Sequence, residues 1–181
     1  AGSAVGGMSS GRDVILAKLS MATGARQWIR TAGVPDGDEE CLALAASGVH
    51  GWAIAGSTSD RVTGESRGFV ATWTKDGAPL WQDTFDVGLP AGDAVFTTGA
   101  RDSSGAVYCG GFTSGSGGAE DFTVVKYDVN GGVEWSDVYD GAAHGTDLCR
   151  DILVRGSGIY ACGVRGRTLL DTSALLVKYQ R

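Results

Sequence analysis

Three tryptophans recur at an almost constant interval, and this repeat limits the fold more than any other feature of the sequence. Trp28, Trp81 and Trp135 are 53 and 54 residues apart, and a glycine stands four positions before each of them. A period of about 50 residues is typical of propellers and other arrays built from one repeated unit. Every unit needs the same packing residue, so we assign the tryptophans to the core, with sugar stacking as the alternative. The glycines of the repeat are Gly24, Gly77 and Gly131.

Each period predicts two β-hairpins. In the third copy, residues 122–127 are rich in β-branched and aromatic side chains, and residues 133–139 follow after an Asn-Gly turn. Residues 152–154 and 159–162 predict the second hairpin. No stretch has apolar residues at helical spacing over a sufficient length. We therefore expect an all-β chain with about four strands per period.

Several of the predicted strands are apolar on both faces. Consecutive apolar residues occur at 14–17, 124–125 and 175–177. A sheet with one face in water would alternate apolar and polar residues, whereas these strands require cover on both sides. Four-stranded antiparallel sheets wedged between neighbours are the blades of a β-propeller, and we expect a propeller-like array of such blades.

The predicted blades are too few to form a complete propeller. The chain divides into a single array at 1–181, with a partial blade at 1–32, blades at 38–87 and 92–140, and a partial blade at 146–181. Residues 4–8 resemble residues 107–112, so the first blade begins at its second strand. About three and a half blades fall short of the roughly four to eight of known propellers, and open sheet edges invite pairing. We expect a segment of a longer propeller or a subunit of an assembly, rather than a free monomer; an open array is the third possibility.

A known repeat family shares this pattern. Asp121–Tyr127, followed by Gly131 and Trp135, and Gly105–Gly111 in the preceding hairpin resemble the bacterial-type β-propeller repeat, abbreviated SBBP. That repeat runs roughly D-x-F-V-x-K-Y-x-x-x-G-x-x-x-W, then a loop, then G-N-V-Y-V-x-G. The resemblance covers essentially the whole chain and implies a propeller fold. It implies little about activity, because the motif describes packing positions.

Lysines also recur at one position of the repeat. They are Lys18, Lys126 and Lys178. They could form a basic stripe, but we favour structural lysines that lie along apolar surface or form salt bridges. Asp13 and Asp121 stand five residues before two of them and are candidate partners. In the second copy Arg67 and Thr72 replace the acid and the lysine together, as expected of a pair.

The densest cluster of charge lies in a predicted loop. Its acidic residues are Asp36, Asp38, Glu39 and Glu40. Clustered carboxylates on a glycine-containing loop could hold Ca²⁺, although the spacing of an EF-hand is absent. A solvated loop is the alternative. No other residues predict a metal or a cofactor.

Two of the four cysteines could form a disulfide. Cys149 and Cys162 flank a predicted hairpin turn at residues 156–158, so they could face each other across paired strands. A disulfide would place the protein in an oxidising compartment, outside the cell or in an organelle lumen. The alternative is four small buried apolar side chains.

Other classes of function are disfavoured. A net charge of -6 argues against general nucleic-acid binding. No apolar stretch approaches the roughly 18 residues that a transmembrane segment needs. His50 and His144 have no neighbouring serine or cysteine nucleophile in the sequence, and no catalytic motif is present. We therefore predict a protein that is not an enzyme.

The leading hypothesis is a scaffold or protein-interaction module that binds protein partners or further blades. Its recognition loops are predicted at 33–40, 57–67, 86–93, 113–120 and 140–147. The first alternative is a carbohydrate-binding or adhesion module, for which Trp52 is the candidate stacking residue. The second alternative is a hydrolase or lyase with a propeller fold that uses His144 and Asp147.

Overall fold

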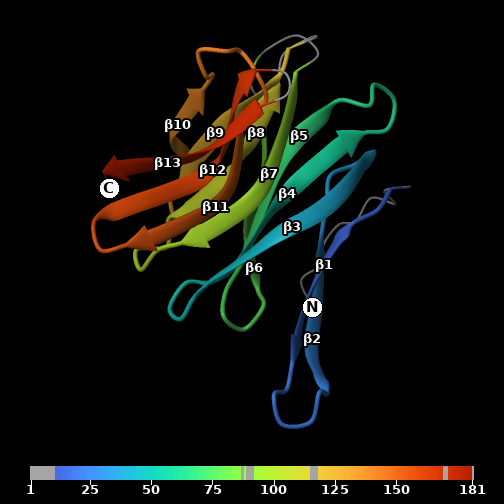
Figure 1. Ribbon diagram of the computed structural model, residues 1–181. Helices are drawn as coiled ribbons and strands as arrows, with labels where there is room; N and C mark the ends of the chain where they lie inside the picture. Colours follow the sequence, from blue (N-terminus) through green and yellow to red (C-terminus); the bar gives the residue numbers. More distant parts are fainter. Residues whose placement is uncertain (1–10, 87, 89–91, 115–117, 169–170, 181) are drawn as a thin grey trace.

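The computed structural model describes residues 11–86, 88, 92–114, 118–168 and 171–180, and within these ranges the chain contains strands and turns but no helix (Figure 1). The expectation of an all-β protein is therefore confirmed. The predicted strand at residues 4–8 lies outside the described residues.

Thirteen strands form four antiparallel sheets in the described part of the chain. Sheet 1 contains β1 (Val14–Leu19) and β2 (Arg26–Ala32). Sheet 2 contains β3 (Gly37–Ser47), β4 (Gly51–Asp60), β5 (Ser66–Trp73) and β6 (Pro79–Phe85). Sheet 3 contains β7 (Asp93–Arg101), β8 (Val107–Ser114), β9 (Glu120–Tyr127) and β10 (Val133–Tyr139). Sheet 4 contains β11 (Leu148–Arg155), β12 (Gly158–Thr168) and β13 (Asp171–Gln180).

Within each sheet, every strand pairs with the next strand along the chain. The sheets follow one another through the molecule, and the β1–β2 hairpin extends away from the others (Figure 1). β7, the first strand of sheet 3, packs against sheet 2, and β11, the first strand of sheet 4, packs against sheet 3. Sheet 1 has the last two strand positions of the four-strand pattern, and sheet 4 has the first three.

The strands are longer than predicted, and two predicted loops are short turns. β4 continues to Asp60 and β5 begins at Ser66, so most of the predicted loop at 57–67 is paired strand. These positions lack the apolar side chains that mark a strand in the sequence. Ser57 and Thr58 are nevertheless buried, and Thr58 donates a hydrogen bond to Glu39. The predicted loop at 33–40 likewise ends at Gly37, where β3 begins.

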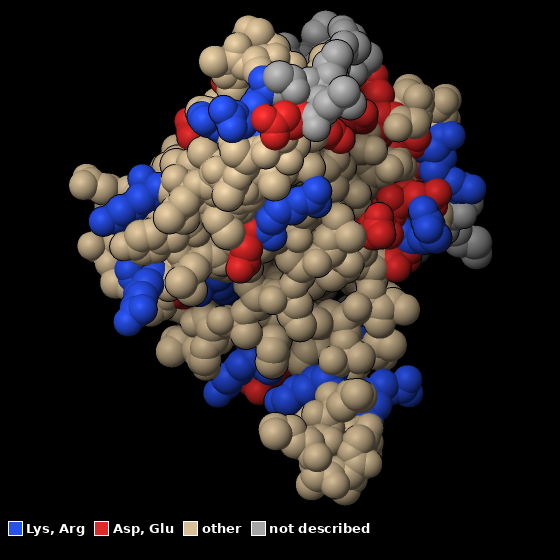
Figure 2. Space-filling view, viewed as in Figure 1, with Lys and Arg blue, Asp and Glu red and all other residues tan. Residues whose placement is uncertain are grey.

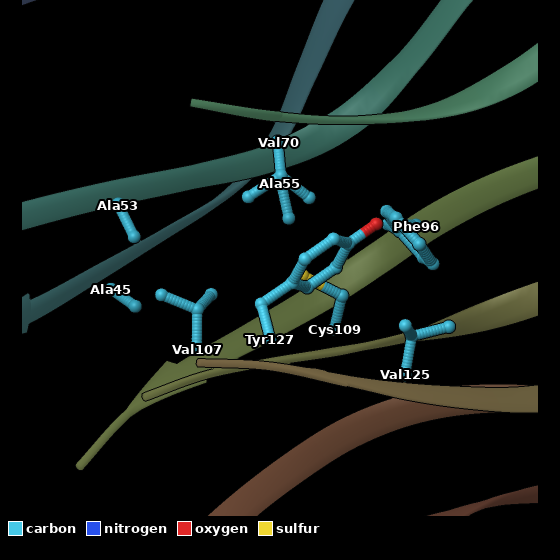
Figure 3. Close-up of a cluster of buried hydrophobic side chains, with 9 residues drawn as sticks. All are labelled: Ala45, Ala53, Ala55, Val70, Phe96, Val107, Cys109, Val125 and Tyr127. Atoms are coloured by element: carbon cyan, nitrogen blue, oxygen red, sulfur yellow. The ribbon is translucent and has the colours of Figure 1, made fainter. Parts of the chain in front are cut away.

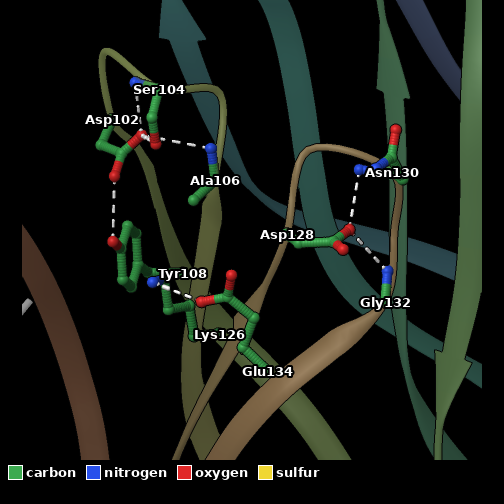
Figure 4. Close-up of polar contacts among 9 residues, drawn as sticks. All are labelled: Asp102, Ser104, Ala106, Tyr108, Lys126, Asp128, Asn130, Gly132 and Glu134. Atoms are coloured by element: carbon green, nitrogen blue, oxygen red, sulfur yellow. Dashed lines mark hydrogen bonds and ion pairs between the residues drawn. The ribbon is translucent and has the colours of Figure 1, made fainter.

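Aspartates hold two of the tight turns (Figure 4). Asp102 Oδ1 accepts hydrogen bonds from the main-chain N–H groups of Ser104 and Ala106, and Asp102 Oδ2 accepts one from the Tyr108 hydroxyl at 3.0 Å. Asp128 Oδ1 accepts main-chain hydrogen bonds from Asn130 and Gly132. These bonds satisfy main-chain N–H groups in the turns, where the hydrogen bonds between paired strands end.

A β-bulge occurs at the same place in the first strand of sheets 2, 3 and 4. The pairing shifts between Cys41 and Ala43, between Phe96 and Thr98, and between Cys149 and Asp151. A glycine stands opposite each bulge, and a Cβ there would overlap a main-chain carbonyl oxygen of the bulged strand. These glycines are Gly56, Gly111 and Gly163. Only glycine allows the two backbones this approach.

The tryptophan–glycine repeat forms contacts between sheets. Trp28 of sheet 1 lies over Gly77 of sheet 2, where a Cβ would be 3.0 Å from Trp28 Cδ2. Trp81 of sheet 2 lies over Gly131 of sheet 3, and its Nε1 donates to the Val129 carbonyl at 3.0 Å. Both glycines have positive φ, 83° and 93°. The repeat therefore links a large ring in one sheet to a glycine turn in the next.

A buried hydrophobic core lies between sheets 2 and 3 (Figure 3). Val70 from sheet 2 packs there with Phe96, Val107, Val125 and Tyr127 from sheet 3, and all five are at most 1% exposed. At roughly 1.5–3 kcal/mol per fully buried side chain, such contacts provide the main attraction between neighbouring sheets.

Burial on both faces of a strand depends on position in the stack. In β9 of sheet 3, Val124 and Val125 point to opposite faces and both are 0% exposed. In β1 of sheet 1, Ile15 is 61% exposed, and in β13 of sheet 4, Leu176 is 71% exposed. The prediction of two buried faces is thus confirmed for β9 and wrong for β1 and β13. The reason is that sheets 1 and 4 each have one neighbouring sheet among the described residues.

Candidate functional site

The three repeated tryptophans lie at junctions between sheets. Trp81 packs against Tyr127 with ring centroids 5.6 Å apart, and Trp135 stacks on Tyr179 at 5.3 Å. Trp28 instead makes an edge-on contact with Trp52 at 6.5 Å. This geometry gives the three rings a packing role, because each one touches the sheet that follows its own.

Two of the three repeated lysines lie against aromatic rings. Lys126 Nζ is 5.7 Å from the Tyr108 ring centroid, and Lys178 Nζ is 5.6 Å from that of Tyr160. Lys126 also forms an ion pair with Glu134 of β10 (Figure 4). Asp121 was the expected partner, but residues an odd number of positions apart in a strand point to opposite faces. Glu134 on the neighbouring strand is the group within reach.

The acidic residues 36–40 do not converge on one point. Asp36 lies before β3 with a positive φ of 61°, and Asp38 accepts a hydrogen bond from the Arg12 main chain at 2.8 Å. Glu39 points to the other face of β3 and is 5% exposed, whereas Glu40 is exposed. The alternation of β3 therefore separates the predicted metal ligands, of which Glu39 is the one held inside.

Glu39 has one satisfied and one unsatisfied carboxylate oxygen. Its Oε1 accepts a hydrogen bond from the Thr58 hydroxyl at 2.7 Å, while its Oε2 is buried without a hydrogen-bond partner among the described residues. Burial raises the pKa of Glu39, hydrogen bonds from the Thr58 side chain and the Val34 main chain lower it, and the carboxylates of Asp13 and Asp38 raise it further.

A three-carboxylate group that the sequence analysis missed lies between sheets 3 and 4. Asp121, Asp140 and Asp147 each offer an oxygen, and these oxygens all lie within 4.8 Å of one another. Asp147 is 0% exposed and accepts hydrogen bonds from the main-chain N–H groups of Gly141 and Gly166. The signal available in the sequence was the recurrence of acids at matching positions of the repeats. Figure 2 shows acidic side chains gathered on two margins of one face, at its top and at its right-hand side.

The two histidines have structural neighbours. His144 Nδ1 is 2.6 Å from Asp140 Oδ2, and His50 Nε2 is 3.0 Å from the Ser103 carbonyl oxygen. The structure brings His144 and Asp147 to the same loop, but both oxygens of the Asp147 carboxylate are bound by main-chain N–H groups. This arrangement fits a loop-stabilising role for Asp147 better than proton transfer.

Trp52 lines a half-open hollow on sheet 1 and sheet 2. Its Nε1 donates to the Lys75 carbonyl at 3.3 Å, which fixes the indole at the edge of the hollow. Met21 is fully exposed at its mouth. The lining residues are Ala17, Lys18, Leu19, Met21, Trp28 and Trp52.

All four cysteines are free thiols in the structure. Cys149 is opposite Gly163 and Cys162 is opposite Asp151, so the two are one position out of register across β11 and β12. Cys149 is buried and Cys162 is exposed. A disulfide between them stays a prediction.

Comparison with models of known protein families and with curated proteins finds no match for this chain. Over the residues described, no helix has the length and apolar character that would be needed to cross a membrane.

Proposed function

We propose that this chain is a non-enzymatic scaffold module whose sheets stack with further sheets of the same kind, as in a β-propeller. The further sheets come from the same polypeptide or from another chain. The observation that carries the proposal is that the contacts between sheets are repeated inside the chain, whereas sheets 1 and 4 each make them on one side only among the described residues.

The unfinished contacts involve the repeated glycine and tryptophan. Gly77 and Gly131 are each covered by a tryptophan from the preceding sheet. For Gly24 in sheet 1, no atom of the described residues lies within 4 Å of a Cβ position. At the other end, Trp135 of sheet 3 stacks on Tyr179 of sheet 4, and Leu176 on the opposite face of β13 is 71% exposed. A preceding and a following sheet would complete both contacts.

The open faces have the composition of buried ones. Leu153 and Leu176 of sheet 4 are 57% and 71% exposed, and Ile15 of sheet 1 is 61% exposed. At the equivalent places of β9 in sheet 3, Val124 matches Leu176 and Thr123 matches Ile15, and both are 0% exposed. Exposed apolar patches on an otherwise packed protein mark interaction surfaces. Sheets of the same repeat are the partner whose side chains fit this pattern, because they already pack on it within the chain.

The molar mass of the purified chain tests this proposal. We expect light scattering after size exclusion to give a mass above the 18.6 kDa of one chain, rising with concentration at micromolar levels. Leu176→Arg should reduce this association. Val62→Arg is the matched control, because Val62 is 91% exposed but lies in the turn between β4 and β5. A stable monomer at all concentrations, with the apolar faces open, would contradict the proposal.

Carbohydrate binding is a second candidate, favoured by the hollow beside Trp52. Aromatic faces stack on sugar rings, and Trp28 and Trp52 both line the hollow. We expect binding to a glycan panel to disappear in Trp52→Ala and to persist in Trp135→Phe. Absence of binding to every glycan tested would remove this candidate.

A further inference from the structure

The junction between sheets 1 and 2 differs from the other two in the charge beside its tryptophan. The strand pairing places the three repeated tryptophans at equivalent positions. Two residues after the tryptophan, sheet 2 has Asp83 and sheet 3 has Asp137, whereas sheet 1 has Arg30. Just before the tryptophan, sheet 3 has Glu134 and sheet 1 has Gln27. Sheet 1 thus has neither acid and carries a base in place of one of them.

At the junction between sheets 3 and 4, each of these acids has a partner. The Tyr179 hydroxyl donates a hydrogen bond to Asp137 Oδ2 at 2.7 Å, and Glu134 forms an ion pair with Lys126. At the junction between sheets 1 and 2, Trp73 occupies the position of Tyr179 and has no hydroxyl to donate. The change from acid to base at this junction therefore accompanies the loss of the hydroxyl that the acid would bind.

Lys18 keeps its position in the repeat without the acid that accompanies it elsewhere. It is opposite Trp28 in the pairing of β1 and β2, as Lys126 is opposite its own tryptophan in β10. The bulge residue next to it is Gln27, which cannot form an ion pair. Within the part of the chain that the structure describes, Lys18 forms no ion pair. Lys18 lines the hollow beside Trp52, so its ammonium is available to an anion there.

The surroundings of the hollow add to this positive charge. The Arg30 guanidinium lies 5.5 Å from the ring centroid of Trp28, and its Nε donates to the Gly77 carbonyl. This distance is shorter than the screening length of about 10 Å in dilute salt. In the turn that contains Gly77, the exposed Lys75 and Asp76 offset one another. Figure 2 shows basic side chains gathered beside the protruding hairpin, on a chain whose net charge is -6.

The walls of the hollow are two indoles held at an angle. The rings of Trp28 and Trp52 have centroids 6.5 Å apart and planes inclined by 68°. Trp52 is fixed by its bond to the Lys75 carbonyl, and Trp28 by its contact with Gly77. The hollow has a volume of about 290 Å³, near the lower end of the range of small-molecule sites. Rings that are fixed before binding lose little freedom when a ligand packs on them.

We propose that this hollow binds a saccharide unit that carries a carboxylate, such as a uronic or a sialic acid. Trp28 and Trp52 contact the apolar face of the sugar ring, and the Lys18 ammonium pairs with the carboxylate. Arg30 contributes to the positive potential without touching the ligand. The inference rests on the carbohydrate candidate proposed above, whose ligand class it names, and does not depend on the stacking of sheets.

Titration of the intact chain with acids and their methyl esters tests the proposal. The probes are the methyl glycoside of sialic acid and tri-galacturonic acid, each compared with its methyl ester, which has the same rings without the charge. Binding is followed by tryptophan fluorescence and by calorimetry. We expect each acid to bind about five- to tenfold more tightly than its ester, as a partly exposed charge pair allows. Salt at about 0.5 M should remove most of this preference.

Variants of two neighbouring residues locate the preference. Lys18→Gln should bind acid and ester equally, with the affinity for the ester within about twofold of wild type, because the indoles are unchanged. Gln27→Glu gives Lys18 the acid that Lys126 has and should remove the preference without altering the lining of the hollow. Lys178→Gln is the matched control: it makes the same change at the equivalent lysine, which lies on Tyr160 in sheet 4, and should keep the preference.

The outcomes separate this proposal from the carbohydrate candidate. Equal affinities of the wild-type chain for acid and ester, with binding lost in Trp52→Ala, would overturn the proposal and leave the candidate standing. A preference that persists in both Lys18→Gln and Gln27→Glu would place the acid elsewhere and would also overturn it. Absence of binding by all four probes would remove the candidate and the proposal together, and would leave the hollow to a covering sheet.

Discussion

Trp81 covers Gly131 so closely that a Cβ on this glycine would lie 2.8 Å from Trp81 Cδ2. The contact joins the outer strand of sheet 2 to the last turn of sheet 3. Gly131 also has a φ of 93°, a conformation that other residues adopt only with strain. One glycine therefore serves both the turn and the junction.

Substitution of Gly131 should cost more than substitution of the equivalent Gly24. Gly24 has a positive φ of 70° but no described atom near its Cβ position, so Gly24→Ala reports the backbone strain alone. We expect a loss of about 1 kcal/mol for Gly24→Ala and about 2–4 kcal/mol for Gly131→Ala, which must also displace the indole. Urea unfolding of both variants measures the difference. Equal losses would mean that Trp81 moves away at no cost.

Asp102 should be among the most sensitive polar residues. It is 5% exposed and accepts hydrogen bonds from Ser104, Ala106 and Tyr108. Asp102→Ala removes the acceptor that the buried Tyr108 hydroxyl and the Ala106 N–H share, so we expect a loss of about 2–4 kcal/mol in the free energy of unfolding. Asp128→Ala, in the exposed turn that follows β9, should lose less. A larger effect for Asp128 would contradict the burial argument.

The cysteines should divide into two classes of reactivity. In the reduced native protein a thiol reagent should titrate Cys41 and Cys162, which are exposed. Burial raises the pKa of Cys149 to about 12 and that of Cys109 higher still, so both should react only after unfolding. Cys162→Ser should remove one of the two fast equivalents. Four fast equivalents in the native state would show that sheets 3 and 4 open readily.

Protonation of Asp128 should lower the free energy of unfolding at acidic pH. Main-chain hydrogen bonds from Gly132 and Asn130 hold the pKa of Asp128 below its ordinary value of 3.8. A carboxyl with a lowered folded-state pKa stabilises the fold above its unfolded pKa, and this contribution is lost as the pH falls through the folded pKa. NMR titration of the side chain should give a midpoint below 3.8. Asp128→Asn should flatten the acid limb of the stability curve, and an unchanged limb would assign that loss to other carboxyls.

The repeat made the strands and their pairing predictable, because it marks positions that must pack in every unit. Trp81, Gly131 and Lys126 are such positions. Residues that break the apolar pattern were harder to place. Thr58 and Glu39 were assigned to loops because they are polar, yet they lie in strands of sheet 2, where the Thr58 hydroxyl donates a hydrogen bond to Glu39. Polar pairs of this kind leave no periodic signal.

The acidic group between sheets 3 and 4 could not be predicted from the sequence, although the sequence contains each of its members. Asp121, Asp140 and Asp147 come from the start of a strand, the end of a hairpin and a loop. Their convergence depends on how sheet 4 packs against sheet 3. Only the alignment with Asp13 and Glu39 in the first repeat could have pointed to it, and that alignment requires the position of the bulge in β3.

The glycines opposite the three bulges indicate how distant relatives of this chain can be recognised. Large aromatic residues at the junctions can differ between copies, since Trp73 occupies the position that Tyr127 has in the third copy. Gly56, Gly111 and Gly163 have no such freedom, because a main-chain oxygen occupies the place of their missing side chain. The ring at that place therefore differs between copies of the repeat, whereas the glycine opposite the bulge is the same in all three. These glycines should therefore be the most reliable positions for recognising further copies of this repeat.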